Sequence, residues 1–254
     1  MRKIIAFQIM TALLFAGAAS AIDANLVAWY TFDEGFGLIA HDSAGNNDGT
    51  ITGATWASGK IGGAMKFNGT NNFVSVPSSA QLNITGNITI AAWVDFFRGG
   101  NGTDGSQQSI VSKWISNGAL NNPFDFRTSA QSVPALELIR ANEFTHEQTS
   151  TWAQVPLNSL HHVAVTAQGA SVNFYIDGTL VSTSWDAPHL LSSPTGNDYA
   201  MLIGARDDGL YFDGLIDDVR IYNRSLSAAE IRNIPEPMTL LLTGLGAAIL
   251  RKKK

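Results

Sequence analysis

The strongest constraint on this fold is a long series of short segments, from residue 26 to residue 222, in which apolar and polar residues alternate. Clusters of Gly, Asn, Asp and Ser separate the segments. Alternation with a period of two places one side of each segment in an apolar core, which is typical of β-strands that are buried on one face. Many short strands with turn residues between them predict an all-β sandwich or barrel.

No segment before residue 225 has a sustained period of 3.6 residues, and no linker divides the region into two parts. We therefore expect a single sandwich over residues 22–234. The expected strands are Leu26–Asp33, Ala64–Phe67, Phe73–Val76, Ile88–Phe97, Ser109–Ile115, Phe124–Thr128, Leu136–Ala141, Thr151–Val155, His161–Thr166, Ser171–Ile176, Thr179–Ser184, Tyr199–Ala205 and Leu215–Tyr222.

One hairpin and one helix can be predicted in detail. Asp177-Gly178 favours a type I′ turn, because both of its central positions need a positive φ. A two-residue loop pairs Ile176 with Thr179 and Phe174 with Val181, and Val172, Phe174, Ile176 and Val181 then face the core. Near the end of the region, Ser227 and Glu230 form a capping box, and Leu226 and Ile231 form a hydrophobic staple. The staple predicts that the fold ends near Ile231.

The N-terminus, residues 1–21, has the pattern of a secretory signal peptide. Arg2 and Lys3 precede a short apolar stretch, Ile4–Ala16, and Ala19-Ser20-Ala21 has the small residues of a cleavage site at Ala19 and Ala21. The pattern predicts that the chain is exported.

The C-terminus, residues 235–254, combines three features. Pro235, Glu236 and Pro237 precede an apolar run, Met238–Leu250, and a basic end follows. As a helix, that run spans about 20 Å, which is short of a hydrocarbon core of roughly 30 Å. The segment resembles a PEP-CTERM sorting signal, which implies a membrane-anchored helix and an exosortase-type membrane protease as partner. The alternative is an ordinary tail anchor, for which the run is short.

The charge of the chain excludes one class of partner. Six of the 16 basic residues lie in the two terminal segments, but only one of the 21 acidic residues does, so residues 22–234 carry a net charge of −10. Nucleic-acid binding depends on Lys and Arg that displace counterions, so we expect no nucleic-acid partner. The absence of Cys excludes disulfides, thiolate metal sites and a Cys nucleophile.

The predicted strands, in their order, resemble the laminin-G-like, concanavalin A-like jelly-roll family over about residues 25–232. The matching pieces are Leu26–Gly35, His41–Thr50, Ala64–Gly69, Phe73–Pro77, His162–Thr166, Phe174–Gly178 and Phe212–Ser227. The sequence departs from the family where Leu160 replaces a Trp before the paired His. The resemblance implies an all-β, two-sheet jelly-roll sandwich between the signal peptide and the short C-terminal hydrophobic helix.

The resemblance also implies a structural calcium ion, with Glu34, Asp42 and Asp217 as its ligands. Calcium takes six to eight oxygen ligands, and the Asn/Asp/Gly loop 41–49 can supply carbonyl groups as well as carboxylates. The alternative is that Asp42 and Asp48 cap turns, as such residues commonly do.

The remaining polar residues form no recognised catalytic motif. Asp207-Asp208 is predicted to be a turn, and Asp217 and Asp218 are expected on opposite faces of a strand, so that neither pair is a catalytic dyad. The jelly-roll hydrolases of the laminarinase type have Glu-x-Asp-x-x-Glu on one strand, and this spacing does not occur here. His162 is interpreted as a packed, hydrogen-bonded residue of the sheet. Trp29 and Trp93 are predicted to be core residues.

These observations predict a non-enzymatic, exported cell-surface or matrix module that binds carbohydrate or exopolysaccharide. Two alternatives remain open at this stage. The chain could be a polysaccharide-degrading enzyme, for which Glu137 and Glu143 would have to converge across a cleft. It could also be a purely structural surface protein that binds no small ligand.

Overall fold

The computed structural model describes residues 23–99, 107–116, 122–141, 146–184 and 198–234. They form sixteen strands and one short helix. The elements are β1 (Leu26–Tyr30), β2 (Ile39–Ala40), β3 (Gly49–Thr52), β4 (Thr55–Ser58), β5 (Gly63–Asn68), β6 (Phe73–Val76), β7 (Ile88–Phe96), β8 (Ser109–Lys113), β9 (Asn122–Thr128), β10 (Ala135–Ala141), β11 (His146–Gln154), β12 (His161–Gln168), β13 (Ser171–Ile176), β14 (Thr179–Ser184), β15 (Met201–Ile203), β16 (Asp213–Tyr222) and α1 (Ala228–Asn233).

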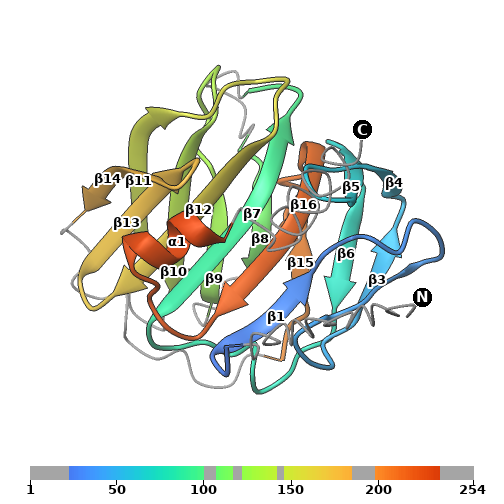
Figure 1. Ribbon diagram of the computed structural model, residues 1–254, viewed down its shortest axis with the longest axis horizontal. Helices are drawn as coiled ribbons and strands as arrows, with labels where there is room; N and C mark the ends of the chain where they lie inside the picture. The colour runs from blue at the N-terminus through green and yellow to red at the C-terminus, as the bar shows by residue number, and fades with distance from the viewer. Residues whose placement is uncertain (1–22, 100–106, 117–121, 142–145, 185–197, 235–254) are drawn as a thin grey trace, which may run out of the picture.

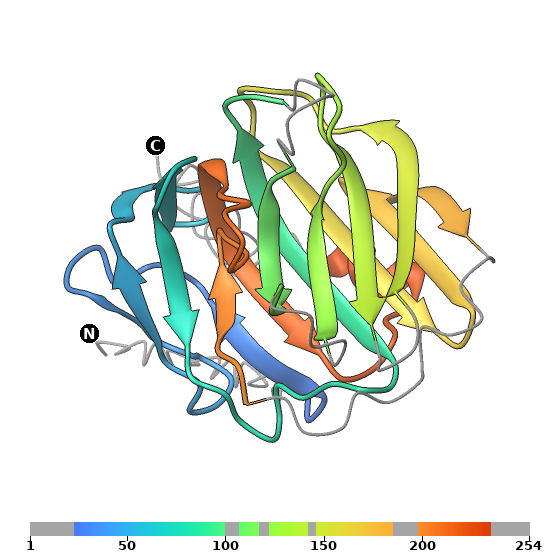
Figure 2. The same ribbon diagram turned by 180° about the vertical axis from the view of Figure 1, so that it is seen from behind.

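The strands form two antiparallel sheets that pack face to face (Figures 1 and 2). Sheet A has the order β14-β13-β12-β7-β16-β5-β4, and β1 pairs with β16 beside it. Sheet B has the order β11-β10-β9-β8-β15-β6-β3-β2. Strands that are far apart in the sequence are neighbours in the middle of each sheet, since β16 lies between β7 and β5, and β15 lies between β8 and β6. The predicted all-β, two-sheet sandwich is confirmed.

The core lies between the sheets and follows the alternation in the sequence. Along β7, Ile88, Ile90, Ala92, Val94 and Phe96 belong to one buried apolar cluster. A second cluster lies on the outer face of sheet A, where α1 packs over the sheet (Figure 1). Its members are Ala91, Ala164, Tyr175, Tyr222, Leu226, Ile231 and Ile234. Leu226 and Ile231 are thus buried together, as the predicted staple requires.

The predicted cap of the helix is also confirmed. The Ser227 side chain accepts a hydrogen bond from the Glu230 backbone N–H, and the Glu230 carboxylate accepts one from the Ser227 backbone N–H. Each bond satisfies an N–H group that would otherwise have no partner at the helix start.

The predicted hairpin is correct at its turn and wrong in one pairing. Asp177 and Gly178 have φ angles of 50° and 71°, as a type I′ turn requires, and Ile176 pairs with Thr179. Phe174 pairs with Ser182 instead of Val181, because a β-bulge shifts the register between Phe174 and Tyr175. Val181 nevertheless packs against the core, so the predicted face is retained.

The sequence prediction missed β2, β3 and β4 and placed the start of β11 five residues too late. The three missed strands have two to four residues each, which is too short for a visible alternation. Pairing with neighbours defines them: β2 and β3 extend sheet B beyond β6, and β4 extends sheet A beyond β5. The missed strands therefore form one end of the sandwich, together with the loops between β1 and β5.

Candidate functional site

Asp42, one of the three predicted calcium ligands, is a fully hydrogen-bonded structural residue. One carboxylate oxygen accepts the backbone N–H groups of Trp29 and Ala44, at 2.9 and 3.0 Å. The other accepts the backbone N–H and the side-chain amide of Asn47, at 3.0 and 3.1 Å. Four donors occupy both oxygens, so Asp42 organises the loop 41–49 in the way that the turn-capping alternative describes.

The other two predicted ligands lie in different surroundings. Glu34 Oε1 accepts the backbone N–H of His41 at 2.7 Å, whereas Asp217 Oδ2 accepts those of Lys60 and Ile61 at 2.8 and 3.1 Å. Over the described ranges, no group of three or more His, Asp or Glu side chains is arranged to hold a metal ion. The structure does not bring Glu34, Asp42 and Asp217 together in one cluster.

Asp217 has the most cation-compatible environment of the three. Its Oδ1 is buried and has no hydrogen-bond partner, as is also true of Glu34 Oε2, but Asp217 lies deeper in the fold. Burial raises the pKa of Asp217 to about 7, and the charges of Asp218 and Asp33 act in the same direction, against the hydrogen bonds from Ile61 and Lys60. A divalent cation would offset both the burial of this carboxylate and the repulsion from the neighbouring negative charges. Asp33 is a second carboxylate that could bind the same cation. It accepts the N–H of Gly63 at 2.7 Å, and Gly63 follows Lys60 and Ile61 in the loop that binds Asp217.

The expectation that Asp217 and Asp218 face opposite sides of a strand is wrong. Ile216 and Val219 both belong to the inter-sheet core although two residues separate them, so both aspartates lie on the outer face of sheet A. The cause is a β-bulge in which Asp218 has a φ of 49°, and the register of β16 against β7 shifts at this point. The Asp218 carboxylate already has two partners: it accepts the Trp29 indole N–H at 2.6 Å and forms an ion pair with Arg220 at 3.1 Å.

Two other predictions on this outer face need correction. Trp93 is buried as predicted, but it lies outside the inter-sheet cluster and contacts His162 in an edge-to-face geometry. Trp29 was expected in the core, but it is only partly buried and lies under the Arg220 guanidinium. Both alternate with core residues, Ala28 and Ala92, and therefore face outward. His162 is fully buried as expected, but neither ring nitrogen has a hydrogen-bond partner. Its ring is held by packing alone.

A ladder of alternating charges, buried except at its Asp208 end, runs across the outer face of sheet B. Arg127 Nε lies 3.0 Å from Glu137 Oε2, and Arg127 Nη1 lies 3.6 Å from Asp125 Oδ2. Arg206 Nη1 continues the ladder at 3.2 Å from Asp125 and pairs at its other end with Asp208. Burial raises the pKa of Asp125, whereas Arg127 and Arg206 act in the opposite direction. We call these five residues the charge ladder.

In the charge ladder, a guanidinium group lies between the carboxylates of Asp125 and Glu137, so the two do not form a catalytic pair. A glycoside hydrolase needs two carboxyl groups that flank one bond, roughly 5–10 Å apart, with room for the sugar between them. Here the Arg127 guanidinium contacts both Asp125 and Glu137. Glu143, the other residue of the hydrolase hypothesis, lies outside the described residues.

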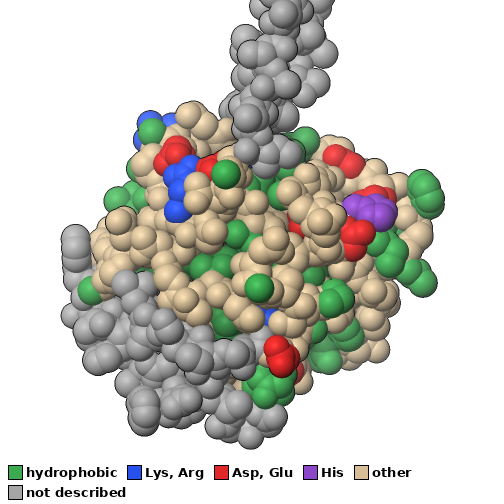
Figure 3. All heavy atoms as spheres, turned by 90° about the horizontal axis from the view of Figure 1, so that it is seen from below, with side chains coloured by type: hydrophobic (Ala, Val, Ile, Leu, Met, Phe, Trp, Pro, Cys, Tyr) green, Lys and Arg blue, Asp and Glu red, His purple; other side chains and the backbone are tan. Residues whose placement is uncertain are grey.

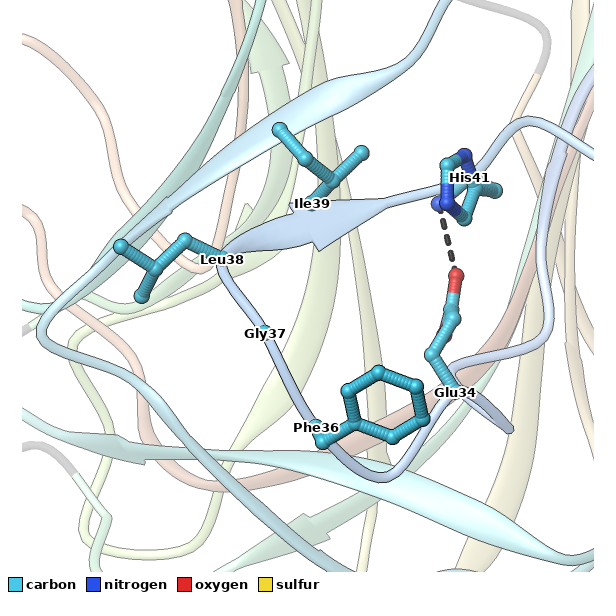
Figure 4. A pocket seen from close by; sticks show the side chains of 6 residues that line it. All are labelled: Glu34, Phe36, Gly37, Leu38, Ile39 and His41. Carbon is cyan, nitrogen blue, oxygen red and sulfur yellow. Dashed lines mark hydrogen bonds between the residues drawn. The ribbon is translucent and has the colours of Figure 1, made fainter.

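A surface cavity of about 410 Å³ opens at the end of the sandwich formed by β2, β3 and β4. It is lined by Glu34, Phe36, Gly37, Leu38, Ile39 and His41 (Figure 4), and we call it the rim pocket. Phe36 and Leu38 are 82% and 67% exposed. In space-filling view, hydrophobic side chains gather at this end beside acidic side chains and a histidine (Figure 3).

The backbone of the rim pocket is well fixed. Gly35 and Gly37 have φ angles of 68° and 85°, which side-chain-bearing residues rarely adopt. The Gly37 carbonyl accepts the Trp56 indole N–H at 3.2 Å, and the Leu38 carbonyl accepts the Ile51 N–H at 2.8 Å. Two backbone anchors therefore fix the loop from which the exposed Phe36 ring projects.

Polar groups border the Phe36 ring on one side. The Phe36 ring and the Glu34 side chain point the same way from the loop, whereas Leu38 extends away from them (Figure 4). Glu34 Oε2 is buried and has no hydrogen-bond partner, whereas the exposed His41 ring lies 3.0 Å from the Asp48 carboxylate. Sequence reasoning assigned Glu34 to calcium and missed the pocket; the available signal was Gly35-Phe36-Gly37-Leu38, which places large apolar residues in a turn.

Within the part of the chain that the structure describes, α1 has six residues, and no helix has the length and apolar character needed to cross a membrane. The predicted cleavage residues Ala19 and Ala21 and the predicted sorting residues Pro235, Glu236 and Pro237 lie outside the described residues.

Several solved structures share this fold. Domain 4 of AbnA, a GH43 extracellular arabinanase from Geobacillus stearothermophilus solved with arabinotriose, has a TM-score of 0.63 and 22% identity, over 84% of this chain and 98% of that one. The binding domain of Paraclostridial Mosquitocidal Protein 1 has a TM-score of 0.64 and 18% identity, over 83% and 52%. Trypanosoma rangeli sialidase has a TM-score of 0.61 and 17% identity, over 84% and 33%. At these identities, the likeness concerns the fold.

Among the curated proteins, none matches this chain. The chain spans about half of the mosquitocidal binding domain and a third of the sialidase, but nearly all of the arabinanase domain. The Laminin_G_3 family profile, described as the concanavalin A-like lectin/glucanases superfamily, matches residues 68–232, which is more than half of the chain. With its two-sheet fold, this chain therefore belongs to the concanavalin A-like lectin/glucanases superfamily.

Proposed function

We propose that this protein is an exported, surface-directed carbohydrate-binding module that recognises polysaccharide through the rim pocket. The observation that carries the proposal is the combination of the exposed Phe36 ring, on a backbone anchored at Gly37 and Leu38, with the exposed His41–Asp48 pair in one pocket. Family membership and the arabinotriose held by the similar arabinanase domain support the choice of ligand class.

The chemistry of the pocket matches that of a sugar ring. The C–H face of a sugar is apolar and stacks on an aromatic ring, whereas its hydroxyl groups need donors and acceptors at the edge. Phe36 supplies the stacking surface, and the exposed His41 and Asp48 side chains supply a donor and an acceptor. Leu38 and Ile39 extend the apolar surface to a second sugar unit.

Binding is a better reading of the described residues than hydrolysis. The charge ladder engages Asp125 and Glu137 with guanidinium partners, so neither carboxylate faces the other across a free space that a sugar could enter. Release of reducing sugar from a polysaccharide by the purified chain would contradict this part of the proposal.

Phe36→Ala should weaken binding to the best ligand of a polysaccharide array at least tenfold, which corresponds to about 1.4 kcal/mol. The expected reason is the loss of the stacking surface. Affinities would be measured with the full chain by isothermal calorimetry. Leu180→Ala is the matched control, since Leu180 is a half-exposed apolar residue on β14, at the opposite edge of sheet A, and should bind as the wild type does.

Equal affinities of the wild type and Phe36→Ala would exclude the rim pocket. No binding to any polysaccharide, together with self-association of the chain, would instead favour the structural-protein alternative.

We further propose that a structural calcium ion binds at Asp217, with Asp33 as the second carboxylate and carbonyl groups completing the shell. Calcium added to chelator-treated protein should raise the Tm, because a ligand that binds only the folded state stabilises it. Asp217→Asn should remove this shift, whereas Asp213→Asn, at an exposed ion pair with Arg98, should retain it. A wild-type Tm that is identical in calcium and in EDTA would exclude the ion.

Export and sorting complete the proposal. Residues 1–21 would direct secretion, and the PEP-CTERM segment would hold the protein in the membrane until an exosortase-type protease acts on it. Replacement of Pro235-Glu236-Pro237 by three alanines should leave the protein in the membrane fraction of a host with this sorting system. Mass spectrometry of the released wild-type protein would locate the cleavage. Wild-type protein retained uncleaved in such a host would contradict the sorting assignment.

A further inference from the structure

Three residues near the start of β12 form a connected relay that the proposed function does not use. Ser159 Oγ lies 2.9 Å from His161 Nε2, and His161 Nδ1 lies 2.8 Å from Asp177 Oδ2. Ser159 is exposed, the His161 side chain is 19% exposed, and that of Asp177 is 50% exposed. A hydroxyl, an imidazole and a carboxylate joined in this order are the parts of a nucleophilic triad.

The relay is held by the fold at each of its members. Asp177 is the first residue of the type I′ turn, and its other oxygen, Oδ1, accepts the His162 backbone N–H at 3.0 Å. His161 begins β12 and pairs with Val94 of β7. Asn158, directly before Ser159, has a φ of 55°, and its N–H donates to the Phe96 carbonyl at 3.0 Å. The turn, the strand and the strained loop together hold the three side chains within hydrogen-bond distance of one another.

The hydrogen bonds also select the proton arrangement that base catalysis needs. An ionised Asp177 carboxylate only accepts, so it favours the tautomer in which His161 Nδ1 carries the proton. Nε2 then presents a lone pair to the Ser159 hydroxyl, which donates to it. The second contact of Ser159 Oγ, with the Leu157 carbonyl, is longer, at 3.5 Å.

The backbone around Ser159 leaves one donor for a developing oxyanion. The Ser159 N–H interacts with the carboxylate of Asp95 and lowers its pKa, against the larger effect of burial, which raises it. The N–H of Leu160, the next residue, forms no hydrogen bond with a described residue. In acyl transfer, a backbone N–H directly after the nucleophile can stabilise the tetrahedral oxyanion.

We propose that Ser159, His161 and Asp177 form an acyl-transfer site that hydrolyses small carboxylic esters. Ser159 Oγ attacks the ester carbonyl while its proton passes to His161 Nε2, and Leu160 N–H stabilises the oxyanion. The C–O bond to the alcohol breaks, and His161 returns the proton to the departing alkoxide. Water then attacks the acyl-Ser159 ester with His161 as base, which releases the carboxylic acid and restores Ser159.

The direct test is covalent labelling of the full chain with a fluorophosphonate, followed by peptide mass spectrometry, together with hydrolysis of 4-nitrophenyl acetate. We expect one adduct, on Ser159, and ester hydrolysis that falls at least tenfold in Ser159→Ala and His161→Gln. Ser171→Ala, on the neighbouring strand β13, is the matched control and should keep the wild-type rate.

Asp177→Asn separates the positioning role of Asp177 from its structural role. Asn-Gly is also a favoured type I′ turn pair, and the Asn oxygen can still accept the His162 N–H, so the Tm should change little. The loss of the carboxylate removes its preference for the Nδ1–H tautomer, so kcat should fall at least tenfold with KM unchanged.

An adduct absent from Ser159, or hydrolysis equal in the wild type and in folded Ser159→Ala, would overturn the site. Unchanged labelling in His161→Gln would do the same for the base. Neither assay uses a polysaccharide, so failure here is distinguishable from failure of the proposed carbohydrate binding.

Discussion

Arg127→Met should lower the free energy of unfolding by about 3–5 kcal/mol, measured by urea denaturation at pH 7. The Arg127 side chain is 6% exposed, and its guanidinium contacts the carboxylates of Glu137 and Asp125. Methionine fills a similar volume but leaves these two buried carboxylates without their shared partner. The expected loss of stability therefore comes mainly from the uncompensated buried charge, and not from an empty cavity in the packing.

Two further variants identify the source of this effect. Arg98→Met removes an ion pair of similar length, 3.0 Å to Asp213, whose side chains are 42% and 26% exposed, and should cost at most about 1 kcal/mol. Adding Glu137→Leu to Arg127→Met removes one of the two stranded carboxylates and should recover part of the loss. A cost below about 1 kcal/mol for Arg127→Met would show that water reaches the charge ladder.

The second large effect is a pH dependence of stability caused by His162. Burial lowers the pKa of His162 to about 4, with a further contribution from Arg220 and an opposing one from Asp177. Between pH 6.5 and pH 4, the unfolded chain binds a proton at this residue and the folded chain does not. Stability therefore falls as the pH falls through this range, by on the order of 3 kcal/mol from His162 alone, and this loss levels off below pH 4.

His162→Phe isolates this contribution. Neither ring nitrogen of His162 has a hydrogen-bond partner, so an apolar ring of similar size loses no hydrogen bond and should be tolerated at pH 7. The free energy of unfolding of this variant should decline much less than that of the wild type between pH 7 and pH 4. His41→Gln, at a mostly exposed histidine, should follow the wild-type curve. Parallel curves for wild type and His162→Phe would show that His162 is protonated in the fold.

Local patterns in the sequence predicted most strands of the domain, one of its tight turns and the cap of its helix. Alternation in β7, the Asp177-Gly178 turn and the Ser227–Glu230 capping box depend on residues that are close in the chain, so the prediction and the structure agree there. The predictions failed where an inserted residue changes the parity of a strand. The bulge at Asp218 moved Asp217 and Asp218 to one face, and the bulge beside Phe174 shifted a pairing that the turn had set.

The candidate sites needed long-range contacts that no local pattern contains. The Asp42 carboxylate is saturated by a loop and by Trp29, and the charge ladder joins β9 and β10 to the residues after β15. The relay of Ser159 and His161 is completed by Asp177, which the sequence identifies only as a turn residue.

By itself, the sequence determined that the chain is an all-β sandwich or barrel, because the alternation of apolar residues requires that one face of each strand be buried. Only the tertiary structure decided which carboxylates are occupied, which rings are exposed and which side chains meet. The physical reason is that hydrophobic burial follows a local period, whereas hydrogen bonding and ion pairing depend on which distant strands become neighbours and in which register.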